Sequence, residues 1–213
     1  TYTLLANEDA EDNNYAFTYT SGTLTVHQAG LMITADDVSK VYGDENPPLT
    51  VSYQGFVKDE DETVLNSPVV VLSAASVESS VGAYAITASG ATAANYQITH
   101  TDGLLTISAK ELTVSAMDQV KVYGESDPEL TYAITAGDLV GEDVLTGALV
   151  RESGEKVGSY AINQGTLLAG ANYELHFEEA DLTIEQAILT LTADAKTKVY
   201  GESDPELTYS ISG

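Results

Sequence analysis

Acidic side chains cluster at one turn of the sequence with a spacing that suits a hard cation. Glu125, Asp127 and Glu129 alternate around this turn, and the same spacing returns at residues 202–206. A second acidic run covers residues 59–62. Ca²⁺ prefers carboxylate oxygens and needs about six to eight oxygen ligands in a fixed arrangement. Acids also favour turns for local reasons, and no Asp-x-Asp-x-Asp-Gly loop is present. The candidate calcium ligands are Glu125, Asp127, Glu129, Asp59 and Asp61.

Lysine is scarce in this chain, yet it recurs at one position. Lys121 and its equivalents Lys40 and Lys198 each precede a Val-Tyr-Gly triplet. A lysine there can pair with an acid across a strand, and an exposed pair of that kind contributes only about 0–1 kcal/mol. The alternative is a spontaneous isopeptide bond from Lys121 to Asn172, assisted by a nearby carboxyl, with Asn95 as the equivalent acceptor in the preceding repeat.

Known catalytic patterns are missing from the sequence. It contains no Gly-x-Ser-x-Gly, His-Glu-x-x-His, P-loop or Gly-x-Gly-x-x-Gly motif. The three histidines are His27, His100 and His176, and none has another histidine or a cysteine nearby. A zinc site needs three or four converging ligands. The same acids recur in every repeat, whereas an active site is usually built once. We therefore expect no enzymatic activity and no cofactor other than a possible calcium ion.

Composition narrows the range of partners and compartments. The formal net charge is −25, with 8 basic and 33 acidic residues. Such a surface repels nucleic acid and anionic membranes. Without cysteine there is no disulfide framework, and no apolar run approaches the roughly 20 residues that span a bilayer. Residues 1–30 carry Glu8, Asp9, Glu11 and Asp12 and no basic leader, which is unlike a signal peptide. Any targeting signal is therefore expected outside this sequence.

An internal repeat of about 80 residues positions these side chains. The stretch 121–132 returns almost unchanged at 198–209 and more loosely at 40–53. In it a glycine accepts positive φ and a proline fixes φ, which predicts a strand, a tight acidic turn and a second strand. We expect the second half of a repeat at 1–29, complete repeats at 30–109 and 110–187, and the first half of a repeat at 188–213.

Each complete repeat is predicted to be mainly β. In the repeat at 110–187, period-two alternation and β-favouring residues predict a series of short strands. A short helix, ended by Gly147, is expected within residues 137–147, with its counterpart at 56–65. The segments expected in strands are 112–116, 120–123, 130–134, 148–151, 160–163, 173–177 and 182–184.

Tyrosines also recur at equivalent strand positions. Tyr84 matches Tyr160, and Tyr96 matches Tyr173. Such rings pack in a core with the hydroxyl at its rim, and this is the reading we favour. The alternative is that they form stacking platforms for carbohydrate.

No linker separates one repeat from the next. Residues 104–114 and 182–191 run across the joins without proline, glycine or a polar tract. Flexible linkers are rich in Gly and Ser, and stiff spacers are rich in Pro. The last strand of one repeat is therefore expected to pass almost directly into the first strand of the next. Stacking of that kind predicts an end-to-end rod whose length grows with repeat number.

These motifs resemble a known family. The pattern Lys-Val-Tyr-Gly-Asp/Glu, then Pro-x-Leu-Thr, Gly-x-Tyr-x-Ile, Ala-Asn-Tyr and a closing Leu-Thr-Ile is similar to MBG-type repeats of the YGX variety. The resemblance implies a tandem module of large surface or secreted bacterial proteins described as adhesins, with a small β-grasp-like or Ig-like sandwich fold. It supplies no catalytic residue and no ligand. The first repeat departs from the pattern at Asn46-Pro47-Pro48.

The resulting expectation is a structural stalk or spacer module of an extracellular bacterial protein. One alternative is an adhesin domain that contacts glycan or host protein through the loops at 56–68 and 137–147. Another is a spacer rigidified by calcium. The expected partners are neighbouring repeats of the same chain. The half-repeats at 1–29 and 188–213 either fray or are held by pairing with a neighbouring domain or chain. Because unpaired strand edges invite strand addition, head-to-tail self-association through these residues is one hypothesis.

Overall fold

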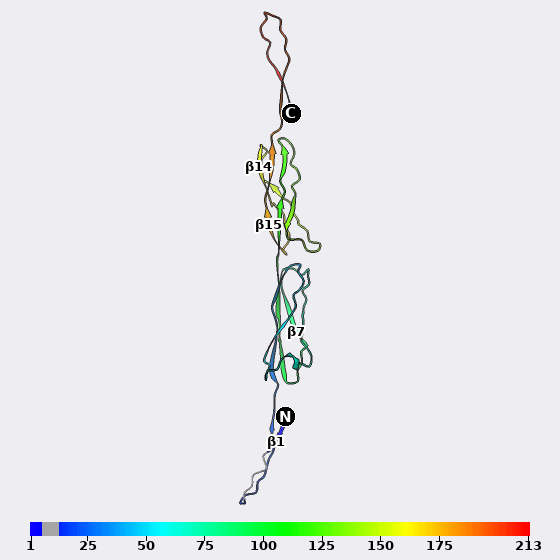
Figure 1. Cartoon of the computed structure of the whole chain (residues 1–213), viewed down its shortest axis with the longest axis vertical. Helices are drawn as coiled ribbons and strands as arrows, with labels where there is room; N and C mark the ends of the chain where they lie inside the picture. Colours follow the sequence, from blue (N-terminus) through cyan, green and yellow to red (C-terminus); the bar gives the residue numbers. More distant parts are fainter. Residues whose placement is uncertain (6–12) are drawn as a thin grey trace. The chain divides into compact units, whose positions relative to one another are not determined.

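The computed structural model describes residues 1–5 and 13–213, and its regular structure is almost entirely β (Figure 1). It divides into two compact units. The first comprises residues 1–40 and 44–108, and the second comprises residues 41–43 and 109–213. The residues Glu8, Asp9, Glu11 and Asp12, and with them part of the half-repeat expected at 1–29, lie outside the described residues.

Residues 29–108 form seven strands in two sheets. One sheet has the order β5-β3-β8 and the other the order β4-β9-β7-β6. β3 pairs with β5 antiparallel and with β8 parallel. β7 is antiparallel to both β6 and β9. The strands are β3 (Ala29–Ala35), β4 (Val38–Val41), β5 (Val51–Gln54), β6 (Val70–Ser73), β7 (Gly82–Ser89), β8 (Tyr96–Thr101) and β9 (Gly103–Ser108).

Residues 110–185 repeat this topology strand for strand. The sheets are β12-β10-β15 and β11-β16-β14-β13. β10 runs parallel to β15, and β11 runs parallel to β16. The strands are β10 (Lys110–Ala116), β11 (Gln119–Val122), β12 (Tyr132–Ala136), β13 (Val150–Arg151), β14 (Gly158–Asn163), β15 (Tyr173–Glu178) and β16 (Ala180–Glu185).

The core of each unit comes from alternate residues of its central strands. In the second unit, Leu112 and Val114 of β10 and Leu182 and Ile184 of β16 are fully buried, with less buried residues between them. Period-two alternation places these side chains on one face of each sheet. In the first unit β3 contacts β7 and β9 of the other sheet, so the two sheets pack on each other.

Two further pairs of strands lie outside these seven-stranded repeats. β1 (Tyr2–Leu4) pairs with β2 (Gly22–Leu24), and β17 (Thr190–Ala193) pairs with β18 (Tyr209–Ser212), both antiparallel. Their side chains are exposed throughout.

The mainly-β tandem architecture is confirmed, and one part of the prediction is wrong. The helix expected within 137–147 does not form, because Gly137, Gly141 and Gly147 all take positive φ, which no right-handed helix accepts. Its counterpart at 56–65 contains only a three-residue 3₁₀ turn, η1 (Glu62–Val64). The two strands that flank the acidic turn, β11 and β12, both form and belong to different sheets.

Candidate functional site

A cluster of ion pairs surrounds Lys121 in the second unit. The Lys121 side chain comes from β11 and is almost fully buried. Its Nζ donates to Asp127 Oδ1 at 2.6 Å, to Glu155 Oε2 at 2.7 Å and to the carbonyl oxygen of Glu125 at 3.1 Å. All three donor positions of the ammonium are therefore satisfied, two of them by carboxylates.

Arg151 completes this cluster from β13. Its Nε donates to Asp127 Oδ2 at 2.7 Å and its Nη2 donates to Asp127 Oδ1 at 3.1 Å. Arg151 therefore binds this carboxylate in a bidentate manner. Nη2 also donates to Glu155 Oε1 at 2.5 Å, and the guanidinium carbon lies 5.5 Å from the centre of the Tyr160 ring. The cluster thus ties the acidic turn to β13 and to the segment that carries Glu155.

The pKa values of this cluster follow from its hydrogen bonds. Those from Arg151 and then Lys121 lower the pKa of Asp127 from 3.8 to about 2. Hydrogen bonds from Lys121 and then Arg151 lower the pKa of Glu155, and those to Asp127 and then Glu155 raise the pKa of Lys121. Every member of the cluster is consequently charged at neutral pH.

The first unit has an equivalent buried lysine that donates to backbone carbonyl oxygens instead of carboxylates. Lys40 is also buried, but its Nζ donates to the backbone carbonyl oxygens of Asp44 at 2.9 Å and Ser76 at 2.7 Å. Asn46 stands where the second unit has Asp127, and its Nδ2 donates to the carbonyl oxygen of Ala75 at 2.6 Å. The buried lysine is shared by the two units, whereas the ion cluster belongs to the second.

A second arrangement in the second unit joins two tyrosines to one carboxylate. The hydroxyls of Tyr173 and Tyr42 both donate to Asp143 Oδ2, at 2.7 and 2.9 Å. The amide of Val140 donates to the Tyr173 hydroxyl at 2.7 Å, and the two rings meet edge to face, 5.6 Å apart. Burial raises the pKa of Tyr173 to about 12. We call Val140, Asp143 and Tyr173 the tyrosine seat, because Tyr42 is held on it.

Gly43 lies directly against this seat. A Cβ atom at Gly43 would lie 2.4 Å from Val140 Cγ2, and φ at this residue is +87°. Only a glycine allows the turn to come this close in this conformation.

The first unit carries an equivalent seat. The amide of Val57 donates to the Tyr96 hydroxyl at 3.0 Å, and that hydroxyl donates to Glu60 Oε2 at 2.5 Å. The hydrogen bond to Glu60 raises the pKa of Tyr96. Lys58 takes a φ of 58° where the second unit has Gly141 at 57°, so the two loops share one backbone conformation at this position. A non-glycine residue in that conformation is uncommon and marks a constrained loop.

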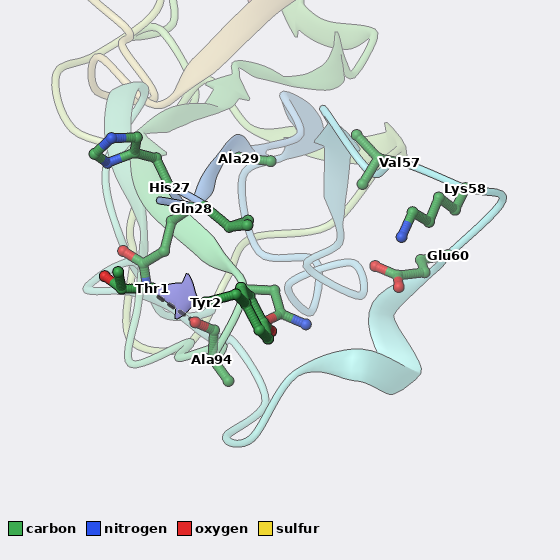
Figure 2. A pocket seen from close by; sticks show the side chains of 11 residues that line it. Thr1, Tyr2, His27, Gln28, Ala29, Val57, Lys58, Glu60 and Ala94 are labelled. Carbon is green, nitrogen blue, oxygen red and sulfur yellow. Dashed lines mark hydrogen bonds between the residues drawn. The ribbon is translucent and has the colours of Figure 1, made fainter. Parts of the chain in front are cut away.

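A cavity of about 460 Å³ opens beside this first-unit seat. Figure 2 shows Val57, Lys58 and Glu60 on one side of it, with Tyr2, Gln28 and Ala94 facing them. In the second unit the corresponding surface of Val140 is covered by Gly43. The first unit therefore presents an open seat and the second an occupied one.

The repeated turns, buried lysines and seats belong to segments that match one family. Residues 31–106, 112–183 and 189–213 match the MBG domain (YGX type). The chain belongs to the MBG domain (YGX type) family. It matches no curated protein and no solved structure at a significant level. Tandem MBG domains are consistent with an adhesin-like repeat module of a surface protein. Within the described residues, no helix is long and apolar enough to cross a bilayer.

The five predicted calcium ligands are either bonded to other groups of the protein or exposed, and are not arranged around one point. Asp127 faces Lys121 and Arg151, and a carboxylate oxygen of Glu125 accepts from the amide of Val122 at 3.0 Å. Glu129 and Asp59 are exposed. Asp61 caps η1 by accepting from the amide of Thr63 at 3.0 Å. Across residues 1–5 and 13–213, no three acidic or histidine side chains converge as a metal site requires.

The two residues of the predicted isopeptide bond, Lys121 and Asn172, have different hydrogen-bond partners. The Lys121 amine is surrounded by two carboxylates, and their hydrogen bonds raise its pKa. A protonated amine is a poor nucleophile, so this environment disfavours attack on an amide. Asn172 instead offers its backbone carbonyl to the amide of Lys110 at 3.0 Å, where β10 begins. The alternative reading, a lysine paired with acids, is confirmed for Lys121.

Sequence reasoning missed Arg151 and both tyrosine seats. Arg151 is a lone arginine with no repeated counterpart, so periodicity gave no signal for it. The seats do have a repeated sequence signal, a valine followed three residues later by an acid. It occurs at Val57/Glu60 and at Val140/Asp143. The repeated Asn-Tyr dipeptides supply Tyr96 and Tyr173, which the sequence predicted as core residues or, alternatively, as stacking platforms for carbohydrate.

Proposed function

We propose that this chain is a load-bearing spacer within a larger extracellular bacterial adhesin-like protein. The observation that carries the proposal is the join between the MBG units. β9 ends at Ser108 and β10 begins at Lys110, so a single residue separates two strands that are each paired in a sheet. A join of this length leaves almost no backbone free to act as a hinge. It therefore supports an end-to-end rod whose length grows with the number of repeats.

Strand directions within the unit support resistance to tension. β10 is its first strand and lies parallel to β15, and its last strand, β16, lies parallel to β11. In a parallel pair, the N-terminal end of one strand and the C-terminal end of the other lie at opposite ends of the ladder. Opposite pulls at those ends load all of the hydrogen bonds together, whereas an antiparallel pair would open one bond at a time.

Two further features support a spacer. The net charge of −25 keeps neighbouring molecules apart. Two sheets on one core, without a helix beside them, favour the sandwich-like over the grasp-like form of the fold. We propose that the array consists of complete repeats at 30–109 and 110–187, with half-repeats at 1–29 and 188–213.

Single-molecule force spectroscopy on the full chain tests this proposal. Tyr123→Pro lies at the end of the loaded β11–β16 ladder, and Glu152→Pro lies at the end of the antiparallel edge pair β13–β14. The amide of Tyr123 donates to the carbonyl oxygen of Glu185, and that of Glu152 to the carbonyl oxygen of Ala161, both at 2.9 Å. Both residues are exposed, and proline removes the amide donor in each case. We expect Y123P to lower the unfolding force of the second unit and E152P to leave it near the wild-type value. Equal losses in both variants, or unfolding of the wild type without a distinct force peak, would rule out load bearing.

A further inference from the structure

The turn at residues 40–44, which we call the Tyr-Gly turn, is divided between the two units. Lys40 and Asp44 belong to the first unit, whereas residues 41–43 belong to the second. The chain therefore passes from one unit to the other at three places: after residue 40, after residue 43 and after residue 108. Two of these crossings lie far in sequence from the join between β9 and β10.

Both ends of the Tyr-Gly turn are held in the first unit. The buried Lys40 Nζ closes the turn by donating to the carbonyl oxygen of Asp44 at 2.9 Å, and it also donates to that of Ser76 at 2.7 Å. The Ser108 hydroxyl donates to the carbonyl oxygen of Lys40 at 3.3 Å. The folded first unit therefore fixes where the turn begins and ends.

The tip of the turn is buried within the second unit. Tyr42 is 4% exposed, and its hydroxyl donates to Asp143 Oδ2 of the tyrosine seat at 2.9 Å. Its ring meets the ring of Tyr173 edge to face. Gly43, with a φ of +87°, lies so close to Val140 that a Cβ atom would approach Val140 Cγ2 to 2.4 Å. The tip is therefore fitted to the seat by a hydrogen bond, a ring contact and a close backbone approach.

We propose that the tyrosine seat is a binding site for the Tyr-Gly turn that makes the folding of the two MBG units interdependent. The seat and the tip bound to it both lie in the second unit, and residues 40 and 44 tie that tip to the first. Binding is strongest when the first unit is folded, because the turn is then already closed and loses less conformational entropy on binding.

The coupling is reciprocal. If a folded first unit strengthens binding of the turn to the seat, then binding of the turn must stabilise the first unit by the same factor. A term of this kind between neighbours makes an array of repeats cooperative. The coupling is a property in addition to the spacer function. It concerns stability in the absence of force, and it stands if the load-bearing role fails.

Two tyrosines that share one acceptor allow a matched comparison. The hydroxyls of Tyr42 and Tyr173 both donate to Asp143 Oδ2, at 2.9 and 2.7 Å. Phenylalanine removes either hydroxyl and keeps the ring. Tyr173 lies in β15, in the interior of the second unit's sequence, whereas Tyr42 lies between two crossings to the first unit. Only the Tyr42 hydroxyl should therefore affect the stability of both units.

Hydrogen exchange of the full chain tests this coupling, read from the slowest amides of the β3–β8 and β10–β15 ladders. A hydrogen bond to a charged group changes an equilibrium constant by about tenfold or more. We expect Tyr42→Phe to speed exchange about tenfold in both units. Tyr173→Phe should speed exchange in the second unit alone. The protection that remains in each ladder shows that both variants are folded.

Tyr123→Phe is a further control. Tyr123 holds the equivalent position in the second unit's own turn and is 54% exposed, so its loss should change exchange in neither unit. An effect of Y42F confined to the second unit, as expected for Y173F, would show that Tyr42 acts only locally and would overturn the proposal. Unchanged exchange in both units of Y42F would overturn it as well.

Discussion

Replacing Asp127 by Asn should destabilise the second unit and leave the first unit unchanged. The substitution gives the second unit the residue that the first unit has at this position, Asn46. The Lys121 side chain is 3% exposed and holds its charge against Asp127 and Glu155. In the variant, the side-chain amide keeps one acceptor for Lys121 but turns an N–H donor toward the donors of Arg151.

The magnitude follows from partial burial. A hydrogen bond to a charged group contributes about 1.5–3 kcal/mol when it is well shielded. Asp127 is 40% exposed, so solvent screening reduces this contribution, and Glu155 remains to neutralise Lys121. We expect a loss of about 1–2 kcal/mol. For a unit of this size, about 1 kcal/mol corresponds to roughly 4–8 °C in melting temperature.

The loss should depend on pH in a defined window. The pKa of Asp127 is lowered from 3.8 to about 2 in the folded protein. A carboxyl with a depressed folded-state pKa stabilises the fold above its unfolded pKa, and this stabilisation is lost as pH falls through the folded pKa. The difference between wild type and D127N should be full at pH 7, shrink below about 3.8 and approach zero near pH 2.

Calorimetry at several pH values measures this difference, and hydrogen exchange of β11 amides assigns it to the second unit. Asp204→Asn is the matched control. It removes the equivalent carboxylate beside Lys198, whose side chain is 45% exposed, and should cost less than about 0.5 kcal/mol. A cost for D127N that is equal at pH 7 and pH 2, or equal to that of D204N, would refute the reasoning.

Three other outcomes are expected. The raised pKa of Tyr173, about 12, means that its stabilisation is complete below pH 10 and is lost as pH rises through 12; Tyr173→Phe should abolish this alkaline loss in denaturant titrations at pH 9–12. Leu182→Ala removes a fully buried side chain and should cost about 2–5 kcal/mol in urea unfolding, whereas Leu189→Ala, at an exposed position, should cost under about 0.5 kcal/mol. Gly147→Ala should lower the melting temperature far more than Gly170→Ala: both have positive φ, but only at Gly147 would the new Cβ meet a backbone carbonyl oxygen, at 2.0 Å.

Much of the fold could be predicted because its signals are local. Alternation in residues 112–116 and 182–184 marks strands whatever they pair with, and both segments form strands. The joins near residues 109 and 187 stay a prediction, which rests on the absence of any strand-breaking residue there. The helix expected within 137–147 failed for a local reason too: Val140 and Val144 have helical spacing, but Gly141 between them takes positive φ.

The site was harder to predict because its partners are distant in sequence. Lys121 meets Glu155 across 34 positions, and Tyr42 meets Asp143 across 101. Periodicity within one strand says nothing about such pairs. The same acid that looked like a calcium ligand, Asp127, is neutralised by Arg151, which no repeat pattern pointed to.

Small-angle X-ray scattering tests the central claim most directly, because a hingeless array of MBG units differs from a flexible one in its maximum dimension. The full chain is compared with the same chain carrying a Gly-Ser-Gly-Ser insertion after Ala109. The account predicts an extended, rod-like profile for the uninterrupted chain and a shorter, broader distribution of distances after the insertion. Identical profiles, or a collapsed particle in both, would contradict it.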